Sequence, residues 1–175
     1  MFTVRPAEKG DAETAVDVVR RSITESCTSD HRNDTDTVAK WLANKTIPHF
    51  VSWLANEDNY CVIAEAGGRL LGVGLVQRSG EISLLYLAPN AQRQGVGKAI
   101  HAALEDKAKT WGLLKLKLDS TVLACPFYAK LGYRAAGAAR PRFGVLHTFP
   151  YEKALQPNNL MQPTGRKRPA ADQER

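Results

Sequence analysis

The sequence has few cysteines and lacks long apolar runs. Cys27, Cys61 and Cys125 form no CxxC or CxxxC pair, which argues against a disulfide framework and against a zinc site. No segment approaches the roughly 18 apolar residues of a membrane span, and the N-terminal residues MFTVRPAEKG contain no signal-peptide core. The Gly-x-Ser-x-Gly elbow of serine hydrolases is also absent. We therefore expect a cytoplasmic protein that uses no metal and has no membrane partner.

The sequence also lacks a strong excess of positive or negative charge. The 175 residues carry a formal net charge of +6, and 43% of them are hydrophobic, as is usual for one globular domain. Residues 156–175 contain four basic and two acidic side chains, which leaves 20 basic and 16 acidic ones elsewhere. Because no basic stripe is visible, the composition argues against nucleic acid as a partner, although it suits an anionic cofactor.

The C-terminal segment QPNNLMQPTGRKRPAADQER differs from the rest of the chain. It holds three prolines and almost no large apolar side chains. Such a segment cannot bury enough apolar surface to fold, so we expect one domain over residues 1–155 and a disordered tail over 156–175. The Gly-Arg-Lys-Arg stretch could still serve as a nucleic-acid-binding or targeting patch. The sequence also allows the protein to form a homodimer.

The apolar pattern predicts helices in the first third and strands after it. A strand at residues 2–5 precedes helical spacing over 11–23 and two shorter helices near 38–42 and 48–54. The period then becomes that of strands, in three runs joined by the turns Gly67-Gly68 and Ser79-Gly80: 60–66, 70–77 and 81–87. These runs predict an antiparallel meander.

The remaining pattern predicts a βαβ crossover. An amphipathic helix over residues 96–111 is followed by a strand at 114–118 and a helix at 121–131. Closing strands follow at 133–136 and 145–153. The order predicts an α/β fold with a mixed sheet.

A glycine turn, Gln92-Arg93-Gln94-Gly95-Val96-Gly97, lies at the start of that helix. Free N–H groups and the helix dipole meet there, where a phosphate can bind. Lys98 is followed by Ala99 instead of Ser or Thr, so the turn is not a Walker A loop. A dinucleotide site needs glycine directly after the strand, which is not the case, but Asp119 at a ribose-binding position keeps it open. A helix that merely begins with glycines is the other alternative.

Three motifs occur at characteristic spacing: LYLAP at 85–89, Q-x-x-G-x-G at 92–97 and PFYAKLGY at 126–133. Together they resemble the GNAT superfamily of acyl-CoA-dependent N-acetyltransferases, over roughly residues 2–153. The resemblance implies a mostly antiparallel central sheet of about six or seven strands, flanked by helices and splayed at the cofactor site. It also implies acetyl-CoA as cosubstrate and an amine as acceptor.

The resemblance gives roles to individual residues. The pyrophosphate would be held by the turn and the first residues of the helix: Gln92, Arg93, Gln94, Gly95, Val96, Gly97 and Lys98. Leu85 and Leu87 would pair with the pantetheine arm, and the Leu87 N–H would stabilise the oxyanion. Tyr128 would protonate the leaving thiolate, unless it only packs against the cofactor. Ser120 and Phe127 would adjoin the cofactor, although Phe127 also suits the core.

An amine nucleophile must lose a proton. Glu81 lies six residues before Leu87, where histone-acetylating members of the family carry a basic glutamate. Strand alternation puts Glu81 on the face of Leu85 and Leu87 unless a bulge intervenes. Alternatively, a chain of water molecules could accept the proton of the amine. Glu81 would then be only a solvent-exposed residue of the hairpin.

The acceptor site is expected in the polar segment after the first helix. Glu25 and His31 lie there and are candidate substrate-binding residues, although a solvent loop is the simpler explanation for both. The acids of residues 22–58 favour a cationic amine, on a small molecule or a protein. The alternative function is a non-catalytic acyl-CoA sensor.

Overall fold

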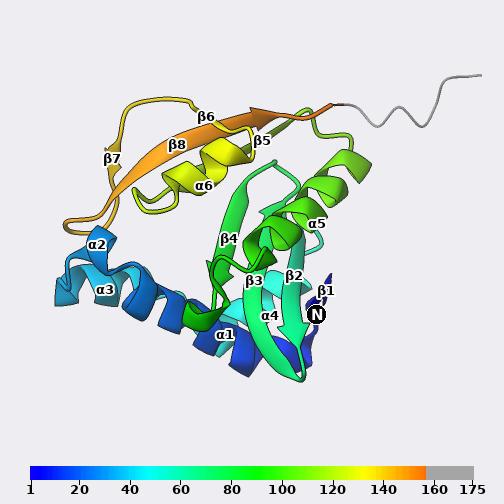
Figure 1. The fold of residues 1–175 in the computed structure, drawn as a ribbon, viewed down its shortest axis with the longest axis horizontal. Helices are drawn as coiled ribbons and strands as arrows, with labels where there is room; N and C mark the ends of the chain where they lie inside the picture. Colours follow the sequence, from blue (N-terminus) through cyan, green and yellow to red (C-terminus); the bar gives the residue numbers. More distant parts are fainter. Residues whose placement is uncertain (157–175) are drawn as a thin grey trace, which may run out of the picture.

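The computed structural model describes residues 1–156 (Figure 1), so that nearly all of the predicted tail lies outside it. In the described part of the chain, eight strands form two antiparallel sheets. The first sheet has the order β1 (Thr3–Pro6), β2 (Asn59–Ala66), β3 (Arg69–Gln77) and β4 (Ile82–Leu87). The second has the order β5 (Lys115–Ser120), β8 (His147–Ala154) and β6 (Arg134–Ala135), with β7 (Arg140–Pro141) also paired to β8. The predicted α/β class and approximate strand number are confirmed.

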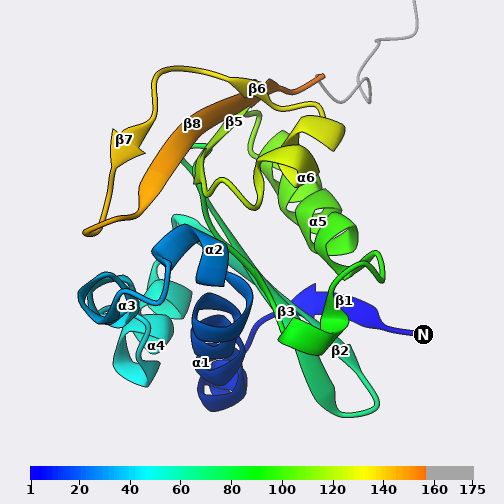
Figure 2. The same ribbon diagram turned by 60° about the vertical axis from the view of Figure 1, so that its left-hand side comes forward.

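Helices cover both faces of the first sheet, as Figure 2 shows. One face packs against α1 (Ala12–Arg21), α3 (Thr35–Leu42) and α4 (Ile47–Ala55). The short helix α2 (Thr28–His31) lies between α1 and α3 in the chain. The other face packs against α5 (Val96–Thr110), while α6 (Cys125–Lys130) lies beside the second sheet. Two separate apolar cores result, one on each face of the first sheet.

Two parts of the N-terminal half differ from the prediction. The segment 24–36 was expected to be an irregular polar break, but α1 continues into a π-helix, η2 (Ser22–Ser26), and α2 follows it. The Thr24 hydroxyl donates to the Arg20 carbonyl, 3.0 Å away, one turn earlier. Short 3-10 turns at Lys9–Asp11 and Pro89–Ala91 complete the described elements.

Glycines on β3 allow α5 to lie very close to the sheet. A Cβ on Gly72 would stand 2.7 Å from the Ile100 side chain, and one on Gly74 would clash with the same isoleucine. The Ile100 side chain is completely buried in this contact. The close approach fixes the start of α5 beside the end of β4, where the predicted cofactor site lies.

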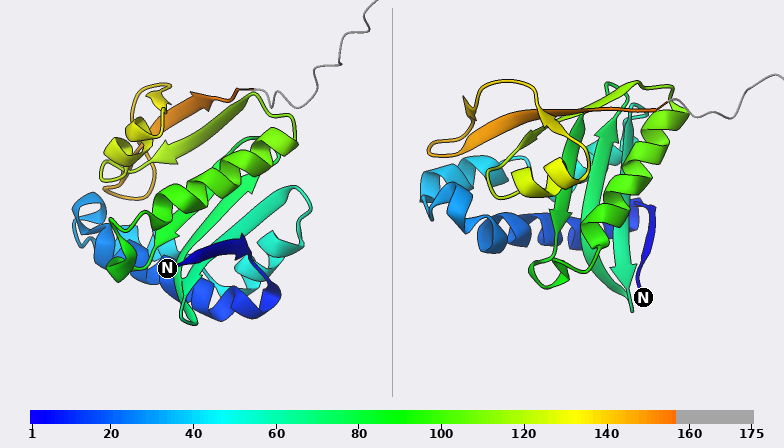
Figure 3. Two further views of the ribbon diagram at one scale, coloured as in Figure 1. Left: turned by 45° about the vertical axis from the view of Figure 1, so that its right-hand side comes forward. Right: turned by 45° about the horizontal axis from the view of Figure 1, so that its top comes forward.

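The two sheets touch at one end and separate toward the other (Figure 3). Within residues 1–156, a single parallel bridge between Glu81 and Lys117 joins β4 to β5. It is supported by a hydrogen bond from the Lys117 N–H to the Gly80 carbonyl, 2.9 Å long. Beyond this bridge the facing edges of β4 and β5 diverge, as the splayed sheet of the prediction requires.

Candidate active site

A cavity of about 390 Å³ fills the gap between β4 and β5. Its walls come from the ends of the two strands, the glycine turn, α6 and η2. It brings together seven residues that the sequence predicted at the cofactor site: Leu85, Leu87, Gln92, Arg93, Ser120, Phe127 and Tyr128. A volume of this size is typical of a small-molecule site.

The pairing of β4 with β3 determines where the backbone of β4 points. Leu87 lies opposite Gly72, and the following N–H, that of Ala88, donates to the Leu71 carbonyl at 2.8 Å. This pattern marks Leu87 and Gly72 as a non-hydrogen-bonded pair, whose N–H and C=O groups point away from each other. The same holds two residues earlier for Leu85. The backbone groups of both leucines therefore face the cavity and not the sheet.

The glycine turn presents a row of free backbone donors. Gly95 is the N-cap residue of α5 and has a φ of 81°, a left-handed conformation that glycine adopts without strain. Within residues 1–156, no N–H from Gln92 to Lys98 donates to another protein group. Such an array at the positive end of a helix dipole suits a phosphate group. A dinucleotide or ATP phosphate would find the same donors, so the turn alone does not select the cofactor.

Other side chains of the turn have their own partners. The Gln94 side-chain amide donates to the Asn90 carbonyl at 2.7 Å and so braces the loop. Val96 is fully buried in the α5 core, so it can offer only its backbone. A Cβ on Gly97 would lie 3.3 Å from the Phe127 ring, so a larger residue here would crowd that ring. The Lys98 side chain is exposed.

Tyr128 is held rigidly at the cavity wall by its neighbours. Its ring is 7% exposed and packs edge-on against Phe127 and Tyr133, with ring centroids 5.1 and 5.4 Å away. Burial, and to a lesser degree nearby Tyr86, raises the pKa of the Tyr128 phenol above its usual value. The phenol is therefore fully protonated at neutral pH and available as a donor.

Ser120 is less available than its position suggests. Its side chain is 1% exposed, and its hydroxyl donates to the Thr121 carbonyl at 2.9 Å. A ligand could still bind to the hydroxyl oxygen as an acceptor.

A second cavity of about 530 Å³ opens on the opposite face of the splay. Six residues line both cavities and mark their meeting point: Trp41, Ile82, Ser83, Tyr86, Asp119 and Thr121. The indole N–H of Trp41 donates to the Tyr86 hydroxyl at 3.1 Å, which leaves the Tyr86 O–H free to donate. Burial raises the pKa of Tyr86 to about 12, so this phenol is also neutral. Two ligands, one bound in each cavity, would therefore come into contact between β4 and β5.

A β-bulge determines the direction of Glu81. The register of β4 on β3 shifts by one residue, and Ser83 is the extra residue. Ile82 consequently packs in the α5 core and Leu84 in the α1 core. Glu81 lines the second cavity and is exposed, so it does not share the face of Leu85.

Several residues of the joined cavities received no role in acetyl transfer from the sequence, among them Asp119, Tyr86, Arg142 and Thr148. Asp119 was considered only as a ribose ligand, yet it lines both cavities. Tyr86 lies within the LYLAP motif but received no role. It lies two residues after Leu84, so strand periodicity places both side chains on the same face of β4, which was the available signal for its position. Arg142 and Thr148 come from the loop and strand at the other end of the domain, and no local pattern connects them with Glu81.

Glu25 and His31 lie outside both of these cavities. The Glu25 carboxylate pairs with Arg21 on the surface, at 2.8 Å. His31 is buried, and its two ring nitrogens bind the Ile23 carbonyl and the Asn33 N–H, each at 3.0 Å. These contacts give His31 a role in holding the segment after α1, so the structure does not bring either residue to the cleft.

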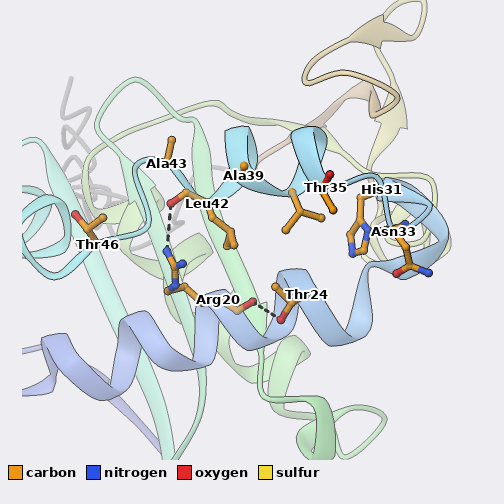
Figure 4. Close-up of a pocket in the computed structure, with 10 residues that line it drawn as sticks. Arg20, Thr24, His31, Asn33, Thr35, Ala39, Leu42, Ala43 and Thr46 are labelled. Carbon is orange, nitrogen blue, oxygen red and sulfur yellow. Dashed lines mark hydrogen bonds between the residues drawn. The ribbon is translucent and has the colours of Figure 1, made fainter.

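A third cavity, of about 690 Å³, lies between α1 and α3 and includes the His31 ring (Figure 4). The Arg20 guanidinium reaches across it to the carbonyls of Leu42 and Lys45, at 3.4 and 3.0 Å. Leu42 is the last residue of α3 and Lys45 lies in the loop after it, so Arg20 caps the helix and holds that loop. The cavity contains no carboxylate and no free nucleophile, and size alone does not make it the active site.

The described residues form no group of three or more His, Cys, Asp or Glu side chains that could hold a metal ion. None of the helices in residues 1–156 has the length and apolar character needed to cross a membrane.

Residues 27–155 match the family model described as an acetyltransferase (GNAT) domain. The match covers more than half of the chain, which therefore belongs to the GNAT acetyltransferase family. This confirms the resemblance that the three sequence motifs indicated.

Similar proteins agree with this assignment. Uncharacterised N-acetyltransferases of Mycobacterium bovis and Mycobacterium tuberculosis are each 28% identical over 116 residues, which cover 62% of this chain and 74% of theirs. A GCN5-related N-acetyltransferase of Rhodopseudomonas palustris has a TM-score of 0.77 at 25% identity, over 87% of this chain and 95% of that one. The PaiA N-acetyltransferase of Thermoplasma acidophilum, solved with coenzyme A, has a TM-score of 0.74 at 20% identity, over 89% and 99%.

Proposed function

We propose that the chain transfers an acetyl group from acetyl-CoA to a primary amine by direct attack in a ternary complex. The observation that carries this proposal is the free backbone edge of β4, where the N–H and C=O groups of Leu85 and Leu87 face the cavity. An extended pantetheine arm can pair with such an edge as an added strand does. The coenzyme A complex of the PaiA relative agrees with this choice of cosubstrate.

Acetyl-CoA supplies an activated acyl group whose C–S bond breaks as a new C–N bond forms. The Leu87 N–H stabilises the negative charge that develops on the carbonyl oxygen, which is worth a few kcal/mol where water is excluded. Tyr128 donates its proton to the leaving thiolate. Glu81 accepts, directly or through water, the proton that the amine loses.

A covalent acyl-cysteine route is disfavoured by the state of Cys27, the thiol that lines the cofactor cavity. Burial and the nearby Asp30 carboxylate raise the pKa of this thiol to about 12. At pH 7 only about one molecule in 10⁵ would carry the thiolate, which is the nucleophilic form. Direct attack by the amine needs no such intermediate.

Thiol release tests the proposal. The full chain is incubated with acetyl-CoA and a panel of primary amines, and free coenzyme A is measured against a control without amine. Release that depends on the amine is expected. If the chain bound acetyl-CoA but released no coenzyme A with any amine, the proposal would be contradicted. That result would favour the alternative function of a non-catalytic acyl-CoA sensor.

The base is tested by comparing Glu81→Gln with Asp119→Asn, since both carboxylates line the second cavity. Glu81→Gln is expected to lower kcat about 100-fold, in the usual range for a general base. A loss confined to Asp119→Asn would move the role to that residue, and no loss in either would favour a water chain.

A further inference from the structure

The second cavity has an unexpected balance of charge. Its acidic residues, Glu81 and Asp119, lie at the β4–β5 junction, where the acceptor amine would react. Its basic residues are Lys40, Lys45 and Arg142, which come from α3, the loop after α3 and the loop before β8. Cations outnumber acids in a pocket expected to receive a cationic amine.

The three cations form no ion pairs inside the second cavity among residues 1–156, although the charge of Lys40 is felt by the Asp34 carboxylate. Lys45 is half-buried, and its ammonium donates to the Asn44 side-chain oxygen and lies over the face of Trp53, 5.8 Å from the ring centroid. The Arg142 guanidinium stands over the Phe143 ring, 5.5 Å from its centroid.

Lys45 and Arg142 act on each other electrostatically. Burial and the positive charge of Arg142 lower the pKa of Lys45 to about 8. Lys45 is half-buried and Arg142 is exposed. The repulsion between two like charges is unfavourable, and an anion bound by both would offset it.

Thr148 provides an independent polar observation in the same cavity. Its side chain is 6% exposed, and its hydroxyl has no hydrogen-bond partner among the described residues. A buried hydroxyl without a partner costs free energy that a bound ligand would recover.

We propose that the acceptor is a small amine that also carries an anionic group, and that Lys45 and Arg142 bind this group while the amine lies near Glu81 and Asp119. This inference rests on the proposed acetyl transfer. The cavity volume of about 530 Å³ accommodates an amino acid or a comparable amino-phosphonate, and carboxylate and phosphonate share the chemistry that two cations recognise.

Matched acceptors test the proposal. Amino acids of increasing chain length are compared with their carboxamides, which have the same amine and no anion, and with the corresponding amino-phosphonates. Rates are corrected for the fraction of unprotonated amine. We expect kcat/KM to be about 10- to 100-fold higher for one or both anionic series, as for other charge-assisted hydrogen bonds. The better anionic series identifies the group.

Variants connect the preference to the two cations. Arg142→Gln and Lys45→Gln are expected to lower kcat/KM for the anionic acceptor about 10-fold or more and to leave that for the carboxamide unchanged. Lys115→Gln is the control, because this exposed lysine pairs with Glu152 and lies outside the cavity. It should retain the preference for the anion.

Two outcomes would contradict the proposal. If kcat/KM were the same for the carboxamides as for the anionic amines, or if the variants lowered kcat/KM equally for both kinds of acceptor, the anion site would be overturned. The proposed acetyl transfer would remain. Absence of thiol release with every amine, although acetyl-CoA binds, would overturn the proposed function together with this inference.

Discussion

At the scale of single residues, Tyr128 offers the clearest test of the chemistry. Its phenol is buried, protonated and fixed between two aromatic rings at the cavity wall. Tyr128→Phe removes the donor and keeps the ring packing. We expect kcat to fall about 100-fold and the Kd for acetyl-CoA to change less than about 3-fold, because the lost interaction serves mainly the transition state. Steady-state kinetics and calorimetry measure the two quantities.

Tyr133→Phe is the matched control for that substitution. Tyr133 contacts Tyr128 and is equally buried, but its hydroxyl binds His101 at 2.9 Å and it does not line the cofactor cavity. This variant should lose stability and keep its kcat. Equal losses of kcat in the two variants would show that Tyr128 acts through packing alone.

At the scale of elements, local signals predicted most of the structure. Gly67-Gly68 predicted the hairpin because both glycines adopt positive φ, 55° and 72°. The amphipathic pattern after Gly95 predicted α5 to within one residue. The bulge at Ser83 and the π-helix at Ser22–Ser26 were not predictable, since each depends on packing partners distant in sequence. The bulge changes the site most, because it turns Glu81 to the acceptor side.

The contact of α5 with β3 makes a prediction at the same scale. Gly74→Ala forces a methyl group into Ile100, whose side chain is fully enclosed. Overpacking of this kind costs about 1–3 kcal/mol. Urea denaturation should show that loss in the unfolding free energy.

Gly10→Ala serves as its control. A Cβ on Gly10 meets no atom within 4 Å, and the residue lies in a short 3-10 turn. Its stability should change by less than about 0.5 kcal/mol. If the two alanine variants were equally stable, the close fit of α5 on β3 would not limit the fold.

At the scale of the whole molecule, two sheets joined by one bridge depend on α5 to stay together. The core beneath α5 contains residues of both sheets, such as Val62 and Leu116. Polar contacts from α5 add to it: His101 binds Tyr133, and Glu105 binds Lys153 on β8. The cofactor cleft was predictable because the three sequence motifs resemble the GNAT superfamily, whose sheet is splayed at the cofactor site. The acceptor cavity was not, since α3, β4 and the loop before β8 meet only in the folded chain.

The state of His101 should therefore appear in the stability of the whole domain. Burial, together with the positive charge of Lys153, lowers the pKa of His101 to about 4 from an ordinary 6.5, although Glu105 opposes the shift. The side chain is 2% exposed. Between these two values the unfolded chain binds a proton that the folded chain does not. The unfolding free energy must then fall as pH decreases from about 6.5 to about 4, by up to roughly 3 kcal/mol.

Urea denaturation at a series of pH values measures this loss, with His101→Gln as the comparison. Glutamine can keep a hydrogen bond to Tyr133 but does not titrate, so the variant should show a much smaller loss between pH 6.5 and 4. The Asp11 carboxylate does not interfere, because its bond to Arg5 lowers its pKa below the usual value and moves its contribution to more acidic pH. An unchanged pH dependence in the variant would assign the loss to other groups. It would also mean that the contact between α5 and the second sheet survives protonation of His101.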